Sequence, residues 1–170
     1  MSDWKGAKVL EPLLKPMASL HPDPQNVRRH DQRNLDTIGK SLERFGQQKP
    51  IVVDQAGLIV AGNGTFQAAA SLGWSQIAVV STRMSVRERR AYAIADNRTA
   101  ELATWDDDAL AKALKSMDEE MLEATGFMAE DVLVVAGELP PNADGKVVDE
   151  SIASGVIMQE CPHCGHKFPK

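Results

Sequence analysis

Apolar and polar positions along the chain follow helical spacing in some stretches and strand-like runs in others. Between residues 34 and 46 the apolar positions recur at helical spacing, with Asn34 as a candidate N-cap and Gly46 as a candidate end. Two short β-branched runs, at 50–53 and 58–61, are separated by a turn-like Asp-Gln-Ala-Gly. These two runs predict a hairpin that follows the helix.

The rest of the chain continues this mixture of elements. Residues 9–20 have the pattern of an extended segment, and the proline-broken polar stretch that follows disfavours helix. A short alanine-rich helix is predicted from near Thr65 to Gly73, then a strand at 76–80. Later helices are predicted at 85–98, opened by Ser85 and Glu88 at capping-box spacing, and at 104–117, with one or two short helices around Gly126.

This order of elements predicts an α+β fold, with a small mixed sheet, packed helices and a helical extension. Residues 137–154 are rich in Gly, Pro, Asp and Asn without periodicity, which predicts a flexible linker before a small tail at 155–170. With 170 residues, 43% of them apolar, the chain has the composition of a globular protein.

Charge and cysteine usage exclude several classes of protein. The net charge of −5 provides no global attraction to nucleic acid, so DNA contact requires a local basic patch. No run is long and apolar enough for a membrane span, and the N-terminus lacks a signal-peptide core, so a cytoplasmic protein is expected. The only cysteines, Cys161 and Cys164, are separated by just two residues and cannot form a disulfide framework.

The turn between the second β-branched run and the alanine-rich helix is the first candidate site. Gly62 and Gly64 permit close backbone approach, and a helix start attracts anions through its unpaired N–H groups. The functional interpretation is a phosphate-binding corner. By spacing alone, a plain strand-to-helix turn is favoured, because Gly-Asn-Gly is far weaker than a complete P-loop.

Charged clusters supply the other candidates. Arg28, Arg29, His30 and Arg33 form a basic segment that fits either nucleotide or DNA phosphates or a solvated loop. Asp96 and Asn97, followed by Arg98, carry the hard oxygens that Mg²⁺ accepts, but taken alone they favour an ordinary helix end. The basic residues at 87–90 are typical of a solvated helix face.

The tail carries a candidate zinc knuckle. Cys161 and Cys164 have the spacing at which two thiolates bind one Zn²⁺, and His166 is a further candidate ligand. Because tetrahedral zinc needs four ligands, the two nearby histidines, His163 and His166, or a second copy of the chain would complete the site. A redox pair is the rival interpretation, but no thioredoxin-like context surrounds it.

Taken together, these segments resemble the ParB N-terminal domain, also called the ParB-like nuclease domain, of the ParB/sulfiredoxin superfamily. "LHPDPQNVRRHD" resembles its opening box, and "SLERFGQQKPIVVDQAGLIVAGNGTFQAAASLGW" resembles its central stretch with the glycine turn. "AYAIADNRTAELATWDDDAL" resembles the third box in the form common to phage members. "CPHCGHKF" resembles half of a zinc ribbon.

The resemblance implies four parts: a nucleotide- and DNA-associated domain at 8–115, a helical extension at 116–136, a linker at 137–154 and a zinc-knuckle-like tail at 155–170. It also implies an α+β fold with a nucleotide-phosphate site, holding CTP or ATP with Mg²⁺. By position, the nucleotide-binding residues are Gly62, Asn63, Gly64, Thr65, Asp96 and Asn97. The phosphate- or DNA-binding residues are Arg28, Arg29, Arg33 and Arg98, and the tail metal ligands are Cys161, Cys164 and His166.

The sequence departs from the family pattern in the turn itself. The family usually carries Arg at the position of Thr65 and often charged residues at Asn63 and Gly64, but here the turn has no charge. A hydroxyl does not replace the bidentate bonds of a guanidinium to phosphate. The cysteine that sulfiredoxin would place in this turn is missing, and no ParB-type helix-turn-helix is evident.

Three functions are therefore considered. The first is a ParB-like protein of phage or mobile-element type that binds nucleotide and DNA, with weak NTPase or nuclease activity. The second is a non-catalytic adaptor that forms a homodimer through a shared zinc knuckle. The third is a small-molecule phosphotransferase, for which Glu43, Glu88, Asp96 and Glu101 are candidate general bases and no catalytic residue is assigned.

Overall fold

The computed structural model describes residues 4–138, 158–160 and 167–169. The chain divides into two compact units, Met1–Gly137 and Glu138–Lys170. In the second unit, β6 (Met158–Glu160) pairs antiparallel with β7 (Lys167–Pro169). The tail ligands Cys161, Cys164 and His166 and most of the proposed linker lie outside the described residues, so the zinc knuckle and the linker stay predictions.

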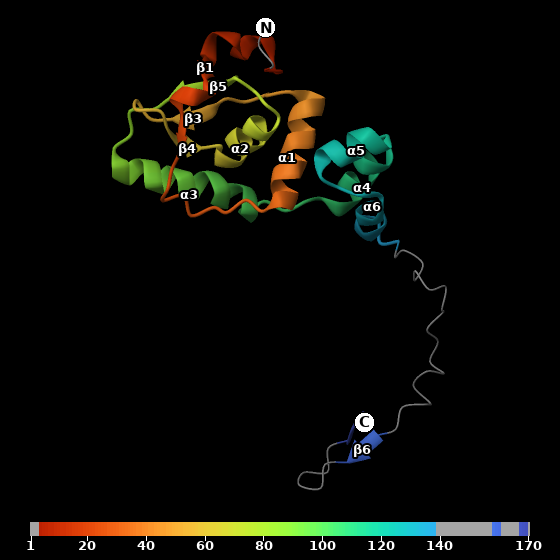
Figure 1. The fold of residues 1–170 in the computed structure, drawn as a ribbon. Helices are drawn as coiled ribbons and strands as arrows, with labels where there is room; N and C mark the ends of the chain where they lie inside the picture. The colour runs from red at the N-terminus through yellow and green to blue at the C-terminus, as the bar shows by residue number, and fades with distance from the viewer. Residues whose placement is uncertain (1–3, 139–157, 161–166, 170) are drawn as a thin grey trace. The chain divides into compact units, whose positions relative to one another are not determined.

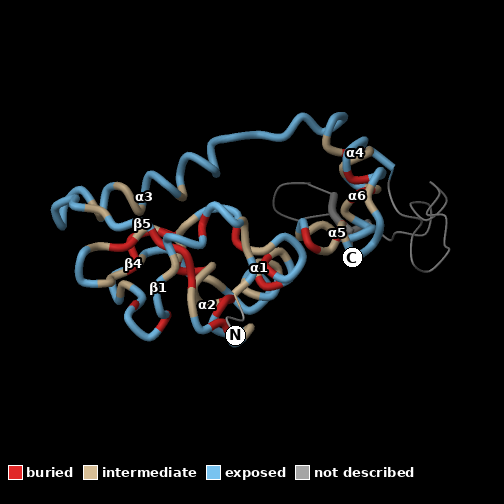
Figure 2. The backbone as a smooth tube through the Cα atoms, turned by 90° about the horizontal axis from the view of Figure 1, so that it is seen from above, coloured by how far each residue is buried: buried red, intermediate tan, exposed pale blue. Residues whose placement is uncertain are grey.

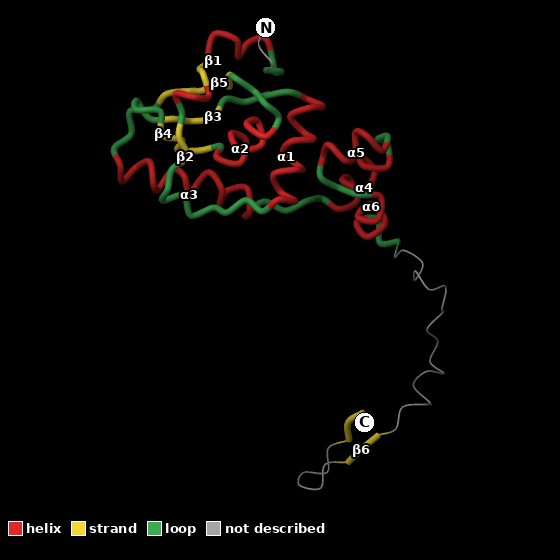
Figure 3. Tube along the Cα trace, viewed as in Figure 1, coloured by secondary structure: helices red, strands yellow, loops and turns green. Residues whose placement is uncertain are grey.

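The first unit is built on a mixed sheet of five short strands (Figures 1 and 3). The strands are β1 (Leu14–Pro16), β2 (His21–Pro22), β3 (Ile51–Val53), β4 (Leu58–Ala61) and β5 (Gln76–Ser81). Their order is β1-β5-β3-β4-β2. The β1–β5 and β3–β4 pairs are antiparallel, whereas β3–β5 and β2–β4 are parallel. The mixed sheet predicted from the sequence is thus confirmed.

The hairpin of β3 and β4 forms where the sequence predicts it. The carboxylate of Asp54 accepts hydrogen bonds from the N–H groups of Ala56 and Leu58, at 2.8 and 2.9 Å. Such a side-chain bond mimics a backbone turn and closes the connection. The hairpin presents the end of β4 to the helix that follows it.

Three helices accompany the sheet: α1 (Gln32–Phe45), α2 (Asn63–Ser71) and α3 (Val86–Leu102). The capping box predicted for α3 is present, because the Ser85 hydroxyl accepts from the Glu88 N–H and the Glu88 carboxylate accepts from the Ser85 N–H. α1 ends at Gly46, as predicted. Each helix therefore begins or ends on a local polar or glycine signal.

The main core lies between the sheet and the helices α1 and α2, which pack against each other (Figure 2). Ile59 and Ile77 from the sheet and Ala69 from α2 are fully buried. Gln47 is a buried polar residue in this core, and its side chain bonds both the N–H and the carbonyl of Ala78, at 2.8 and 2.9 Å. These hydrogen bonds link the segment that follows α1 to β5.

The remaining helices form a second hydrophobic cluster. They are α4 (Asp107–Lys115), α5 (Glu119–Thr125) and α6 (Ala129–Val135). Leu114, Leu122 and Val132 are the buried residues of this cluster. α5 contacts α1, and Lys40 pairs with Glu123 at 2.6 Å. The helical extension predicted from the sequence is therefore folded against α1.

Three sequence-based expectations about the elements are wrong. Residues 9–20 form two 3-10 helices, Lys8–Leu13 and Met17–Ser19, around β1 instead of one extended segment. α1 is capped by Asp31, whose carboxylate accepts from the Asn34 N–H, rather than by Asn34. Residues 96–98 do not end a helix, because α3 continues to Leu102. Among the described residues, no helix has the length and apolarity to cross a membrane.

Candidate functional site

The glycine turn lies at the join of β4 and α2. Gly62 is the N-cap of α2 and adopts the left-handed conformation, with φ of 95° and ψ of 26°. A Cβ atom at Gly62 would stand 2.5 Å from Cγ2 of Ile51 on β3. Both the positive φ and the close approach of β3 require glycine here. The turn is consequently fixed by the sheet.

The first turn of α2 faces a cavity with groups that lack a partner within the helix. The N–H groups of Asn63, Gly64 and Thr65 belong to the first helical turn, where no preceding carbonyl is available. Asn63 is only 6% exposed, and its Oδ1 atom is buried without a hydrogen-bond partner. Buried polar atoms are nearly always paired, so this atom indicates a missing ligand or water.

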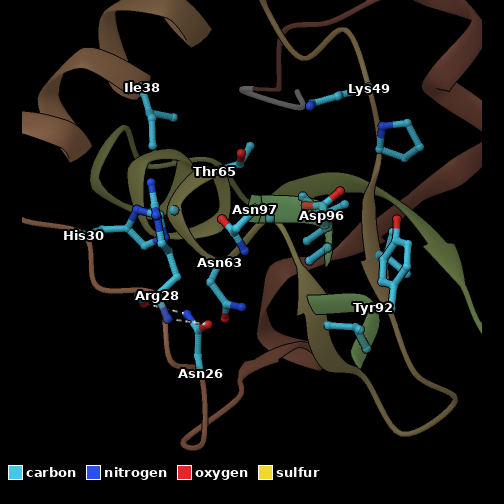
Figure 4. A pocket seen from close by; sticks show the side chains of 17 residues that line it. Asn26, Arg28, His30, Ile38, Lys49, Asn63, Thr65, Tyr92, Asp96 and Asn97 are labelled. Atoms are coloured by element: carbon cyan, nitrogen blue, oxygen red, sulfur yellow. Dashed lines mark hydrogen bonds between the residues drawn. The ribbon is translucent and has the colours of Figure 1, made fainter. Parts of the chain in front are cut away.

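The cavity has a volume of about 290 Å³ and is bordered mainly by four separate parts of the chain (Figure 4). Its lining comes from the polar segment before α1, from residues 49–52 at the start of β3, from the end of β4 with the turn and the start of α2, and from the middle of α3. The polar side chains that line it are those of Asn26, Arg28, His30, Lys49, Asn63, Thr65, Tyr92, Asp96 and Asn97.

The charged side chains at the cavity are mostly basic. Its basic lining residues are Arg28, His30 and Lys49, and its acidic lining residue is Asp96. Arg28 forms an ion pair with Glu101 near the end of α3. A hydrogen bond from Arg28, assisted by a second from Arg98, holds the pKa of the Glu101 carboxyl below its usual value. A locally basic cavity therefore exists in an acidic chain.

Two amide side chains organise the walls. The Asn26 Oδ1 accepts from the Arg28 N–H at 3.2 Å, and its Nδ2 donates to the Arg28 carbonyl at 2.9 Å, so the segment bends around Asn26. The Nδ2 of Asn97 donates to the Ala93 carbonyl at 2.8 Å. This bond leaves Oδ1 of Asn97 as the atom that can coordinate a cation or accept a hydrogen bond.

The structure brings together most residues that the sequence singled out. Seven of them line the one cavity: Arg28, Gly62, Asn63, Gly64, Thr65, Asp96 and Asn97. Arg29 lines a more open hollow of about 630 Å³ that shares Arg28, His30 and Asn97 with the cavity. Arg33 and Arg98 line neither hollow, and Arg98 instead pairs with Glu101 at 3.3 Å.

Four polar lining residues were not chosen as site residues from the sequence: Asn26, His30, Lys49 and Tyr92. Asn26 stands two positions before Arg28 in the opening box, which was a usable signal. His30 belongs to the same basic segment, but nothing in its spacing distinguishes it from a solvated loop residue. Lys49 and Tyr92 carry no local pattern, because only the tertiary fold brings them to the turn.

A known family covers the part of the chain that builds this cavity. The model of the ParB N-terminal domain matches residues 13–98, which is half of the chain. The chain belongs to the ParB N-terminal domain family. The match includes every wall of the cavity described above. The resemblance to the ParB N-terminal domain is thereby confirmed, whereas the phage-type form and the zinc knuckle stay predictions.

Individual relatives agree with this assignment. The chain is 30% identical over 74 residues to the "ParB-like nuclease domain-containing protein YnaK" of Escherichia coli strain K12, spanning 44% of this chain and 85% of that protein. A solved structure of the chromosome-partitioning protein ParB from Caulobacter crescentus, complexed with CTP-γ-S, is similar with a TM-score of 0.61 at 20% identity. That similarity covers 72% of this chain and 74% of the other, and it confirms the α+β fold.

The capacity of the cavity to bind a metal ion depends on its oxygen donors. Within the described residues, no group of three or more His, Cys, Asp or Glu side chains is placed to hold a metal ion. A cation here would therefore need amide oxygens beside the carboxylate of Asp96. Asn63 Oδ1, which lacks a partner, and Asn97 Oδ1 belong to residues that line the same cavity. These hard oxygens suit Mg²⁺ bound with a phosphate.

Proposed function

We propose that this ParB-family chain binds a nucleoside triphosphate with Mg²⁺ at the corner of β4 and α2, and acts in association with DNA. The observation that carries the proposal is the buried, unpaired Oδ1 of Asn63 at the start of α2, inside a cavity with basic walls. A ligand that brings both negative phosphates and a cation satisfies the helix N–H groups and this oxygen together.

In this proposal the phosphates lie against the first turn of α2. The unpaired N–H groups of Gly64 and Thr65 donate to phosphate oxygens, and the Thr65 hydroxyl adds one hydrogen bond. Arg28 supplies a charge-assisted bond from the opposite wall. The N-cap glycine allows the phosphates to approach the backbone closely.

The cation in this proposal is held from α3 and α2. Asp96 contributes the carboxylate, and Asn97 and Asn63 contribute amide oxygens. Mg²⁺ bound there neutralises the phosphate charge and fixes the orientation of the triphosphate. Because these residues come from two different helices, cation binding also links α3 to the turn.

The relatives support this assignment at the level of the family. The Caulobacter ParB of the similar structure is complexed with CTP-γ-S, so CTP is the first nucleotide to test and ATP the second. The Escherichia coli relative is described as carrying a ParB-like nuclease domain. DNA partition, modification or mobile-element processing, with weak NTPase or nuclease activity, are the roles that we propose for this chain.

Phosphotransfer is a second candidate function, and it rests on Asp96. Of the carboxylates considered as general bases, Asp96 lines the cavity, whereas Glu88 caps α3 and Glu101 pairs with Arg28. Glu43 lies at other hollows on α1. A carboxylate beside bound phosphates can accept a proton from a hydroxyl nucleophile.

Isothermal titration of the full chain with CTP, ATP and GTP, with and without Mg²⁺, tests nucleotide binding. We expect one nucleotide to bind in a Mg²⁺-dependent manner, and Asp96→Asn to weaken the dependence on Mg²⁺. Thr65→Arg is expected to raise affinity about tenfold, because it restores a guanidinium at the turn. The control Arg87→Ala, at the exposed start of α3, should bind as the wild type does. Absence of binding by all three nucleotides rejects the proposal.

DNA association is tested separately by gel shift and by its salt dependence. Arg29 lines the more open hollow of about 630 Å³, and Arg33 follows it four residues later in the chain. Both side chains are exposed, so they are available to DNA phosphates. The double variant Arg29→Ala, Arg33→Ala should reduce the affinity for DNA. It should also reduce the slope of log affinity against log salt concentration by an amount that corresponds to about two phosphate contacts. Equal binding by this variant and by Arg87→Ala rejects the assigned DNA contacts.

A further inference from the structure

The space above Gly64 is filled by an imidazole from another part of the chain. A Cβ atom at Gly64 would stand 2.7 Å from Cε1 and 2.9 Å from Nδ1 of His30. Gly64 is buried and lies in the first turn of α2. No side chain fits at this position while His30 keeps its place, so the glycine and the histidine depend on each other.

A hydrogen bond fixes the orientation of the ring. Nδ1 of His30 lies 2.7 Å from Oδ1 of Asn34, at the start of α1. Because the amide oxygen accepts, Nδ1 carries the proton, and Nε2 is the ring nitrogen that remains for a ligand. Protonation of the imidazole at Nε2 turns that nitrogen from an acceptor into a positively charged donor.

The position of this ring matters because the turn itself has no charged side chain. Residues Gly62, Asn63, Gly64 and Thr65 contain no Lys, Arg or His. His30 lies at the same cavity and against the backbone of the helix start, where the proposed phosphates bind. The guanidinium at the cavity, that of Arg28, also pairs with the carboxylate of Glu101.

We propose that His30 is a second phosphate-binding cation of this site, beside Arg28, and makes nucleotide affinity depend on pH. The inference rests on the proposed function, since it assigns a phosphate contact within the same cavity. The imidazolium donates from Nε2 to a phosphate oxygen of the nucleotide. Affinity therefore rises as pH falls through the titration of the imidazole, and phosphate binding in turn favours the protonated ring.

The charged groups near His30 are of both signs. Its own segment carries Arg28, Arg29 and Asp31, and the neutral amide of Asn34 faces it from α1. α2 contributes no charge at Gly64 or Thr65. Across the cavity, the charged lining residues are Asp96 on α3 and Lys49 before β3.

The first test compares wild type with His30→Gln in titrations of CTP and Mg²⁺ at several values between about pH 6 and about pH 8. Glutamine stays neutral throughout and can still bond Asn34. The nucleotide phosphates titrate in the same range, but identically for both proteins, so the ratio of the two affinities isolates His30. We expect this ratio to increase about tenfold from the alkaline to the acid end.

The second test moves the ring without replacing it. Gly64→Ala introduces a Cβ into the position of His30, so affinity and its dependence on pH should both fall. Gly39→Ala is the matched control, because this buried helical glycine of α1 has no atom within 4 Å of an added Cβ. The double variant Gly64→Ala, His30→Gln should bind no more weakly than His30→Gln alone. Thermal melts establish that each variant is folded.

The outcomes separate the two proposals. An affinity ratio that is constant with pH, in a wild-type chain that does bind nucleotide, overturns the role of His30 and leaves nucleotide binding intact. Absence of nucleotide binding at every pH overturns the proposed function and the role of His30 with it. A ratio that rises toward acid pH, together with the loss in Gly64→Ala but not in Gly39→Ala, supports the assignment.

Discussion

The two helices that border the cavity are held in opposite ways. Four of the nine residues of α2 are buried, and its N-cap is Gly62, where the close approach of β3 leaves no room for a side chain. α3 is 17 residues long and has no buried residue (Figure 2). Polar contacts hold it instead: Arg89 pairs with Asp54, Arg90 donates to Gln25, and Glu101 accepts from Arg28.

This difference indicates how the site is built. The half of the cavity that faces the proposed phosphates is part of the core, and its geometry changes only at the expense of core packing. The half that carries Asp96 and Asn97 rests on contacts that are individually weak and exchangeable with water. The cation side of the cavity is therefore the side that can adjust to a ligand.

The largest expected effect is at the turn. Gly62→Ala should lower the free energy of unfolding by about 3 kcal/mol, because a left-handed alanine is strained and its Cβ meets Ile51. Gly73→Ala is the control, since Gly73 also has positive φ, of 76°, but open space around it. This control should lose about 1 kcal/mol. Urea denaturation measures both, and equal losses would contradict the role of β3 packing.

A matched pair of substitutions compares the two helices directly. Ala69 in α2 is completely buried, so Ala69→Leu should cost about 2 kcal/mol through overpacking. Ala95 in α3 is exposed, so Ala95→Leu should change stability by less than about 0.5 kcal/mol. Denaturation midpoints of the two variants give the comparison. A loss at Ala95 as large as at Ala69 would show that α3 is packed after all.

The polar attachment of α3 is tested at its first turns. Arg89→Ala removes a pair whose side chains are only 18% and 14% exposed, and we expect a loss of about 1 kcal/mol. Arg87→Ala, on the exposed start of the same helix, should be neutral. Limited proteolysis within α3 should accelerate in the first variant and remain unchanged in the second. Identical proteolysis rates would indicate that the pair does not hold α3.

The smallest effect concerns the pH dependence of the pair at the end of α3. Because the pKa of Glu101 is lowered in the folded state by Arg28 and then Arg98, its contribution is complete above the unfolded-state pKa. It is lost as pH falls through the lowered pKa. The melting temperature of wild type should therefore exceed that of Glu101→Gln near neutral pH and converge with it in acid. A gap that persists in acid would assign the effect to something other than ionisation.

The elements that local chemistry controls could be predicted well. The hairpin at 51–61 follows from β-branched runs and an Asp-containing turn, and the start of α3 follows from the Ser85–Glu88 capping box. Asn34 was a wrong N-cap because Asp31, three residues earlier, bonds its N–H. The 3-10 helices near the N-terminus escaped prediction because prolines and tertiary contacts, not periodicity, shape that segment.

By itself, the sequence determined the family, the α+β class and the glycine turn, because these depend on residue types at fixed local spacing. Only the tertiary structure decided which distant side chains complete the cavity. His30 and Lys49 reach the cavity through the packing of α1 and the sheet, whereas Arg98 does not line it and pairs with Glu101 on α3. Contacts between segments dozens of residues apart arise from packing of buried faces, which local patterns do not encode.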